Sequence, residues 1–124
     1  MHTIILASLR VDQWQTFSDA LQAATRADIV KVRSGAEALK AAQKLNPMAV
    51  AIDAELDDLA GVELVRQLLG INAMINTALA SEKPEEIFHK ETEGLGILMQ
   101  LSSLPTSAEA GRFAERLRQV AGAV

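Results

Sequence analysis

Short apolar runs alternate along this chain with longer segments in which apolar residues recur every three or four positions. The runs are rich in Ile, Val, Leu and Ala, and they are too short for helices and too uniformly apolar for strands with one wet face. Such runs are typical of strands that are buried on both faces of a parallel sheet. The predicted strands span Thr3–Ala7, Asp28–Arg33, Met48–Ile52, Ile75–Ala80 and Ile97–Leu101.

The segments between these runs have the period of amphipathic helices. Asp12 followed by Gln15 resembles a capping box, which predicts that the first helix starts there after a loop over residues 8–11. Ser34 with Glu37 predicts the start of the second helix. Gly61 leads into a third helix that Gly70 ends, Pro84 suits the first turn of a fourth that ends near Gly94 and Gly96, and Ser107 starts the last. The side chains expected inward are Trp14, Phe17, Leu21, Ala24, Ala38, Leu39, Ala42, Leu45, Val62, Val65, Leu68, Leu69, Ala110, Phe113, Ala114, Leu117 and Val120, with Met48, Met74 and Met99 as core packing.

Strict alternation of strands and helices predicts an α/β fold with right-handed crossovers and helices on both faces of a parallel sheet. The 124 residues suit a single domain over 1–124, and 49% hydrophobic residues are enough for a real core. A net charge of −4 argues against nucleic-acid binding, and the lack of cysteine excludes disulfides and thiolate metal sites. The apolar run over 4–7 is too short to span a membrane, so we expect a cytoplasmic protein.

The stretch from Met48 to Gly61 organises the candidate chemistry. Its apolar run ends abruptly at Asp53, and ligand chemistry in open α/β sheets gathers outside the carboxyl ends of the strands. We therefore expect Asp53 at the functional edge of the sheet.

At this point the chain resembles the receiver domain of bacterial response regulators. The most specific match is Ser34-Gly35-Ala36-Glu37-Ala38-Leu39, then Asp53 at a strand end, then Gly61 eight residues later. The resemblance implies a CheY-like (flavodoxin-like) (βα)5 fold with strand order 2-1-3-4-5. It also implies that Asp53 stands at the phosphoacceptor position.

The rest of the receiver site departs from the family pattern. An acidic pair that holds Mg²⁺ maps to Ala7 and Ser8, and a Thr or Ser on the fourth strand maps to Ala80, with Ser81 beside it. A lysine maps to Gln100, or to Leu104 if Leu104-Pro105 represents the family's Lys-Pro pair. Asp53 and Glu55 remain as a weak Mg²⁺ pair, because two carboxylates without a nearby cation raise one another's proton affinity. We therefore expect a degenerate acceptor site with no metal and no cofactor.

The leading hypothesis is a non-catalytic signalling domain of the two-component phosphorelay type that acts through protein contacts. Its expected partners are a histidine kinase or a downstream effector, with a homodimer as a further candidate, and its interface candidates are Arg112 and Arg116 on the last helix. One alternative is a working receiver that accepts phosphate on Asp53. Another is a flavodoxin-like cofactor binder, which is disfavoured because the loop over 8–11 lacks a phosphate cradle. Lone His89 and the Asp57-Asp58 pair are interpreted as solvated surface.

Overall fold

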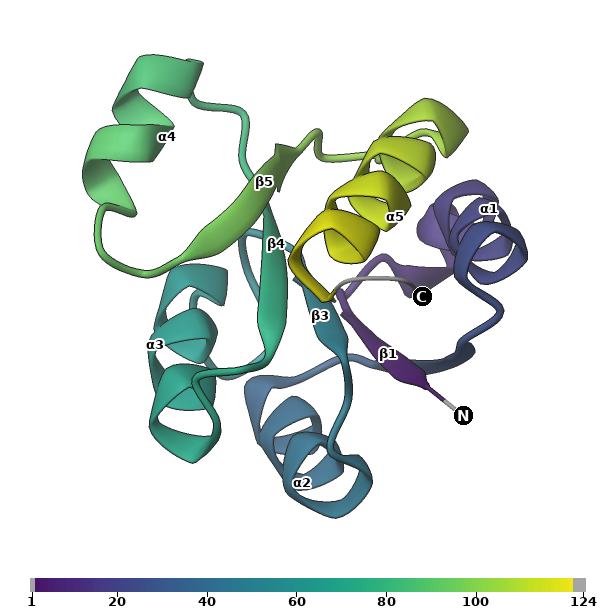
Figure 1. The fold of residues 1–124 in the computed structure, drawn as a ribbon. Coiled ribbons are helices and arrows are strands. Elements are labelled where there is room, and N and C mark those ends of the chain that lie inside the picture. The colour runs from purple at the N-terminus through teal and green to yellow at the C-terminus, as the bar shows by residue number, and fades with distance from the viewer. Residues whose placement is uncertain (1, 122–124) are drawn as a thin grey trace.

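The computed structural model describes residues 2–121 and contains one five-stranded parallel sheet (Figure 1). The strand order is β2-β1-β3-β4-β5, as the resemblance implies. Short, β-branched and alanine-rich segments form the strands, which pack between helices instead of facing water. The strands are β1 Thr3–Ala7, β2 Asp28–Val32, β3 Ala49–Ile52, β4 Asn76–Ala80 and β5 Ile97–Leu101.

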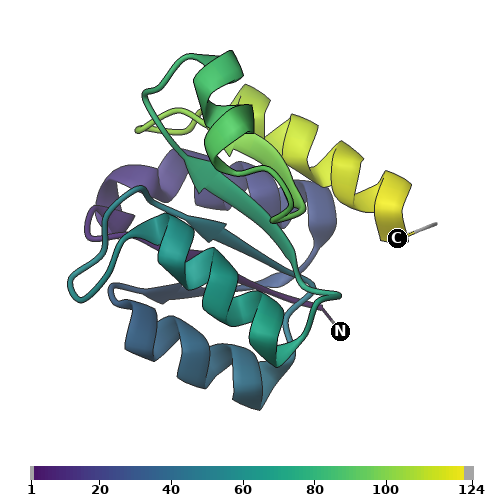
Figure 2. The same ribbon diagram turned by 90° about the vertical axis from the view of Figure 1, so that its left-hand side faces the viewer.

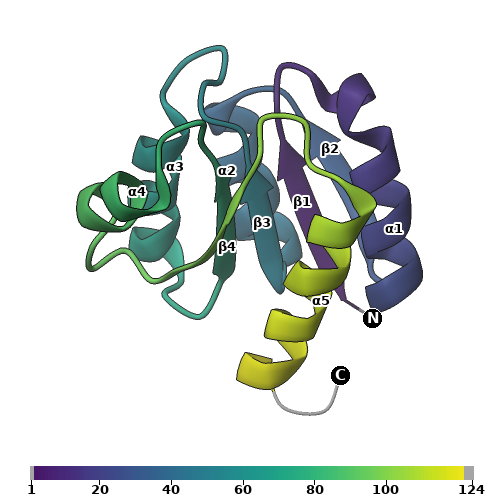
Figure 3. The same ribbon diagram turned by 90° about the horizontal axis from the view of Figure 1, so that it is seen from above.

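Five α-helices connect and flank the strands and make a three-layer structure. They are α1 Gln15–Thr25, α2 Gly35–Leu45, α3 Gly61–Ile71, α4 Glu85–Glu91 and α5 Ser107–Ala121, and a 3₁₀ helix, η1 Val11–Trp14, precedes α1. Helices α1 and α5 cover one face of the sheet, and α2 and α3 cover the other (Figures 2 and 3). None of the helices within 2–121 is long and apolar enough to cross a membrane.

The alternation of side chains along β3 divides the core into two halves. Ala49 and Ala51 face α1 and α5, whereas Val50 and Ile52 face α2 and α3. The small alanine side chains leave room on the first face for the large aromatic side chains of Trp14, Phe17 and Phe113, which are fully buried. Because β3 is buried on both faces, its carboxyl end presents the next residue, Asp53, at the edge of the sheet.

Several sequence predictions about element ends and inward residues are wrong. Helix α1 does not start with a capping box at Asp12: that residue is exposed and belongs to η1, and the side chain of Gln15 bonds to Asp19 and Lys31 instead. Strand β2 ends at Val32 and α3 continues through Gly70 to Ile71. Three residues predicted to be inward are exposed, because they lie at an element's last turn or in a loop beyond the core: Leu45, Met74 and Val120.

Candidate functional site

Asp53 lies directly after β3, and its side chain is buried at the carboxyl edge of the sheet, with 4% of the residue exposed. Its backbone N–H donates to the carbonyl of Ala7 at 2.8 Å, which continues the pairing of β3 with β1. Oδ1 accepts from the backbone N–H of Ala54 at 2.8 Å, and Oδ2 accepts from the Ser8 hydroxyl at 2.7 Å. Both carboxylate oxygens are therefore held by hydrogen bonds.

The guanidinium group of Arg10 lies against the same carboxylate. Its Nε and Nη2 atoms donate to Oδ2 of Asp53 at 3.3 and 3.2 Å, and Nη2 also reaches Oδ1 at 3.2 Å. The expectation that Asp53 has no nearby cation is therefore wrong. The family pattern places its cations at other positions, so the resemblance does not indicate Arg10, which lies in the loop after β1.

The same Arg10 side chain connects Asp53 to the loop that follows β5. Nη2 donates to the backbone carbonyl of Ser103 at 2.8 Å, and the indole N–H of Trp14 points to that carbonyl at 3.3 Å. On its other side, the backbone N–H of Ser103 donates to Glu82 in the β4–α4 loop at 3.2 Å. Arg10 thus joins the carboxyl ends of β1, β3 and β5 through one side chain.

The positions that match the receiver motif surround Asp53 but carry different chemistry. Ala7 is fully buried and has no polar side chain, while Ser8 is also fully buried and its hydroxyl contacts Asp53 directly. Ala80 is buried, and the Ser81 hydroxyl accepts from the backbone of Lys83 in a local turn.

Gln100 does not take over the role of a lysine at this site. Its amide donates to the backbone carbonyls of Ser81 and Lys83 at 3.0 and 2.8 Å, which fastens β5 to the β4–α4 loop. Leu104, the other position that could represent the lysine, is half exposed.

The structure does not assemble a cluster of metal ligands in the described part of the chain. Within residues 2–121, no three His, Asp or Glu side chains come close enough together to hold an ion. Glu55 is exposed and takes part in the loop through a backbone bridge to Ala60. A divalent cation at Asp53 would also have to displace Arg10 from the oxygens it occupies.

The loop after Asp53 is fixed at two further points. Asp58 accepts from the backbone N–H groups of Gly35 and Ala36 at 2.7 and 3.0 Å, and these hydrogen bonds lower the pKa of its carboxyl group. The acidic turn is therefore not simply solvated, since Asp58 caps the N-terminus of α2. Gly61 packs so closely that a Cβ atom there would lie 2.1 Å from the carbonyl oxygen of Asp53.

The two arginines predicted as interface candidates lie on the exposed side of α5. Arg116 donates to the carbonyl of Leu98 in β5 at 2.8 Å, so part of its role is structural. Arg112 forms no hydrogen bond or ion pair within residues 2–121. Both arginines line a surface cavity between α4, β5 and α5, to which Glu85 and His89 also contribute.

No family model matches the chain, and no curated protein sequence matches it either. Solved structures do match over nearly its whole length. A chemotaxis response regulator, CheY4 of Vibrio cholerae, superposes with a TM-score of 0.80 and 18% identity, covering 94% of this chain and 98% of that one. A CheY-like receiver domain protein from Methanospirillum hungatei has a TM-score of 0.81 and 11% identity, covering 96% and 95%.

A longer protein matches in the same way. The response regulator DrrB of Thermotoga maritima, an OmpR/PhoB homologue, gives a TM-score of 0.83 with 14% identity, covering 98% of this chain and 54% of its own. These identities are low, and they establish an architecture and not an activity. The strand order and the placement of the helices agree with that architecture, and the chain therefore has the CheY-like fold of response regulator receiver domains.

Proposed function

We propose that this chain is a receiver-like signalling domain that acts through protein contacts and does not depend on phosphorylation of Asp53. The main support for the proposal is the set of hydrogen bonds that Nε and Nη2 of Arg10 donate to both carboxylate oxygens of Asp53. In this reading, Asp53 is an anchor for the surrounding loops and not a nucleophile. The role of the domain is binding, not catalysis.

The charge balance at Asp53 supports this proposal. Phosphoryl transfer needs a free carboxylate oxygen to attack and cations to offset the negative charge that develops on the transferred group. Here the attacking oxygens already accept from Ser8, Arg10 and the Ala54 backbone. Moving Arg10 away would leave a buried carboxylate without its partner, which is costly.

The position of Arg10 also supports a fixed state of the loops around Asp53. A guanidinium group donates several hydrogen bonds in a rigid plane, so one arginine can hold a carboxylate and a carbonyl together. Arg10 holds Asp53 and Ser103 in this way, and Glu82 holds the opposite side of Ser103. The domain would then present one constant surface to its partner.

The surface formed by α4, β5 and α5 is the proposed contact region. Arg112 supports the choice because it is exposed and makes no polar contact within residues 2–121. A partner with an acidic residue opposite Arg112 would gain a charge pair at that point. A histidine kinase, a downstream effector or a second copy of the chain could supply that contact.

Incubation with Mg²⁺ and acetyl phosphate tests the proposal, with intact-mass spectrometry as the measurement. We expect no phosphoryl adduct on the wild-type protein under conditions that fully modify a conventional receiver run in parallel. The control is Asp53→Ala, which removes the only carboxylate at the acceptor position. An adduct on the wild type that is absent from Asp53→Ala would show a working receiver and contradict the proposal.

A further inference from the structure

We propose that the cavity between α3 and α4 binds a small, uncharged organic molecule with an apolar body and a polar edge. The cavity measures about 410 Å³, which lies within the usual range for small-molecule sites, roughly 300–1,000 Å³. It lies beside the loop that follows Asp53, and the cavity next to Asp53 shares Ala54, Glu55, Ala80 and Ser81 with it.

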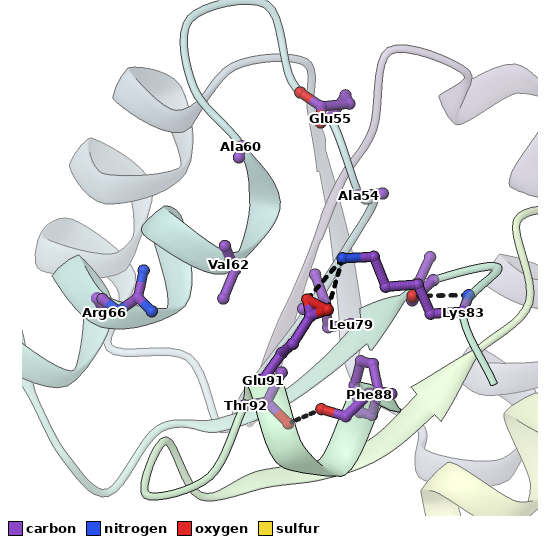
Figure 4. Close-up of a pocket in the computed structure, with 12 residues that line it drawn as sticks. Ala54, Glu55, Ala60, Val62, Arg66, Leu79, Lys83, Phe88, Glu91 and Thr92 are labelled. Atoms are coloured by element: carbon purple, nitrogen blue, oxygen red, sulfur yellow. Dashed lines mark hydrogen bonds and ion pairs between the residues drawn. The ribbon is translucent and has the colours of Figure 1, made fainter. Parts of the chain in front are cut away.

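The inner part of the cavity is apolar. Leu79 of β4 and Phe88 of α4 are almost completely buried, and Val62 of α3 is half-buried between them and the solvent. Figure 4 shows Val62 on one wall and Phe88 on the other, with Leu79 between them. Apolar side chains of this kind favour a ligand that buries an apolar surface.

The rim of the cavity carries charges of both signs in equal number. Lys83 and Glu91 form an ion pair on the α4 side, with Nζ of Lys83 2.5 Å from Oε2 of Glu91. Arg66 lies on the opposite wall, and Glu55 lies at the end toward Asp53 (Figure 4). The side chain of Arg66 is half exposed, and its own pair with Glu63 is long, at 3.4 Å.

This balance of charges determines the class of ligand. An anion drawn to Arg66 would be repelled by Glu55 and Glu91, and a cation would meet Arg66 and Lys83. Because neither sign gains a net attraction, burying an ion here would cost desolvation without repayment. An uncharged molecule with both a donor and an acceptor can bond to Glu91 on one side and Arg66 on the other.

A second surface cavity of similar size has a more polar lining than the cavity between α3 and α4. The cavity between α4, β5 and α5 has a similar size, about 340 Å³, but charged and polar side chains such as Glu85, Arg112 and Arg116 line much of it. It lacks the continuous apolar floor that Val62, Leu79 and Phe88 form between α3 and α4. The proposed site does not depend on the state of Asp53, so it stands or falls separately from the proposed function.

Three probes of equal shape and different charge test the proposal: benzamide, benzoate and benzamidinium. Each is titrated into the full chain, and amide shifts are followed by NMR at Val62, Leu79, Phe88 and Thr92, which line the cavity. We expect saturable shifts with benzamide and weaker binding of both charged probes. Val62→Trp fills the cavity and abolishes the shifts, whereas Ile87→Trp, on the exposed side of α4, leaves them unchanged.

Arg66→Ala is the second variant, because Arg66 is exposed enough to be replaced without loss of the fold. We expect it to weaken benzamide binding by about tenfold, the effect of losing one hydrogen bond to a charged group. Thermal unfolding verifies that each variant is folded. If Val62→Trp does not fold, the comparison of Arg66→Ala with the wild type tests the proposal. Any of three results would overturn the proposal: benzamide gives no saturable shifts, the folded variants bind benzamide as tightly as the wild type, or a charged probe binds as tightly as benzamide.

Discussion

Asp53 depends on a single long side chain for the balance of its charge. Arg10 reaches it from the loop after β1, and the Arg10 side chain is 38% exposed while the Asp53 side chain is 6% exposed. An arginine that is partly exposed loses less solvation than a buried cation would, so its pairing with a buried carboxylate is more favourable than that of two buried ions. We therefore expect the Arg10–Asp53 pair to contribute to the free energy of unfolding of the domain as well as to the charge balance of the site.

Arg10→Ala should lower the free energy of unfolding by about 1–3 kcal/mol, because Asp53 loses a charged hydrogen-bond partner in a buried position. Urea denaturation measures the change. Trp14 emission should also shift in the native state, since the indole shares the Ser103 carbonyl with Arg10. Arg112→Ala is the matched control and should change the stability by less than about 0.5 kcal/mol. Equal stability of the two variants would contradict this role of Arg10.

Gly61 is required by the close approach of its backbone to Asp53. A methyl group at position 61 would meet the Asp53 carbonyl oxygen at 2.1 Å, so Gly61→Ala should destabilise the domain by about 1–3 kcal/mol or more. Gly70→Ala is the control in the same helix: nothing lies within 4 Å of its added Cβ, and the change should stabilise α3 by roughly 0.5–1 kcal/mol. Thermal unfolding of both variants decides, and similar shifts in the same direction would refute the explanation.

At the scale of elements, the start of α5 is fixed by a reciprocal capping box. Glu109 accepts from the backbone N–H of Thr106 at 2.9 Å, and the Thr106 hydroxyl accepts from the N–H of Glu109 at 3.1 Å. Glu109 also accepts from the backbone N–H and the hydroxyl of Ser102. Burial by itself raises the pKa of Glu109, but these hydrogen bonds outweigh it and hold the pKa below its ordinary value of 4.5.

The lowered pKa of Glu109 makes part of the stability depend on pH. Its contribution is fully present above pH 4.5, the ordinary value, and is lost as the pH falls through the lower pKa of the folded state. Glu109→Gln should therefore cost stability at neutral pH and flatten the loss of stability below pH 4.5. Glu115→Gln, on the exposed side of α5, is the control. Denaturation curves recorded from neutral pH to below pH 4.5 measure the stability of each variant. If the stability of Glu109→Gln and that of the wild type change with pH in the same way, the capping role of Glu109 is contradicted.

The N-terminus of α2 is fixed by a side chain from the loop after β3. Asp58→Ala removes the acceptor for the N–H groups of Gly35 and Ala36, so these amides should exchange with solvent faster. Asp57→Ala changes the neighbouring residue, which is exposed and makes no hydrogen bond to α2 in the described structure. Hydrogen-exchange NMR compares the two variants. Equal exchange at Gly35 and Ala36 in both would show that Asp58 does not cap α2.

At the scale of the whole molecule, the strands could be predicted from the apolar runs, the sheet order followed only from the resemblance to receiver domains, and the site could be predicted only in part. The apolar runs predict the observed bounds of β1 and β5, and those of β3 to within one residue, because burial on both faces leaves a pattern that a short sequence window contains. The partner of Asp53 leaves no such pattern. Arg10 lies 43 residues away in sequence, and its reach follows from the approach of the β1 and β3 ends in the folded sheet.

The caps at the N-termini of α5 and α2 also differ in how far apart their residues lie in the sequence. The predicted start of α5 at Ser107 is confirmed, and the capping box of Thr106 and Glu109, which are three residues apart, could also have been found from the sequence. Asp58 and Gly35 are 23 residues apart, and only the fold brings them together. A cap between residues close in sequence can thus be found from the sequence, although the predicted one at Asp12 does not form, whereas the charge balance at Asp53 depends on tertiary contacts.

In the proposed function, the hydrogen bonds from Arg10 occupy the Asp53 carboxylate and close the acceptor position. The most direct test is NMR of the Arg10 Nε–H group during titration with Mg²⁺ and beryllofluoride, which mimics a phosphoryl group on a carboxylate. We predict that the Arg10 signal stays in place, as the hydrogen bond to Asp53 persists, and that Asp53→Ala alone shifts it. A saturable shift of the Arg10 signal in the wild type that is lost in Asp53→Ala would show that Arg10 leaves Asp53 and that the acceptor position is open.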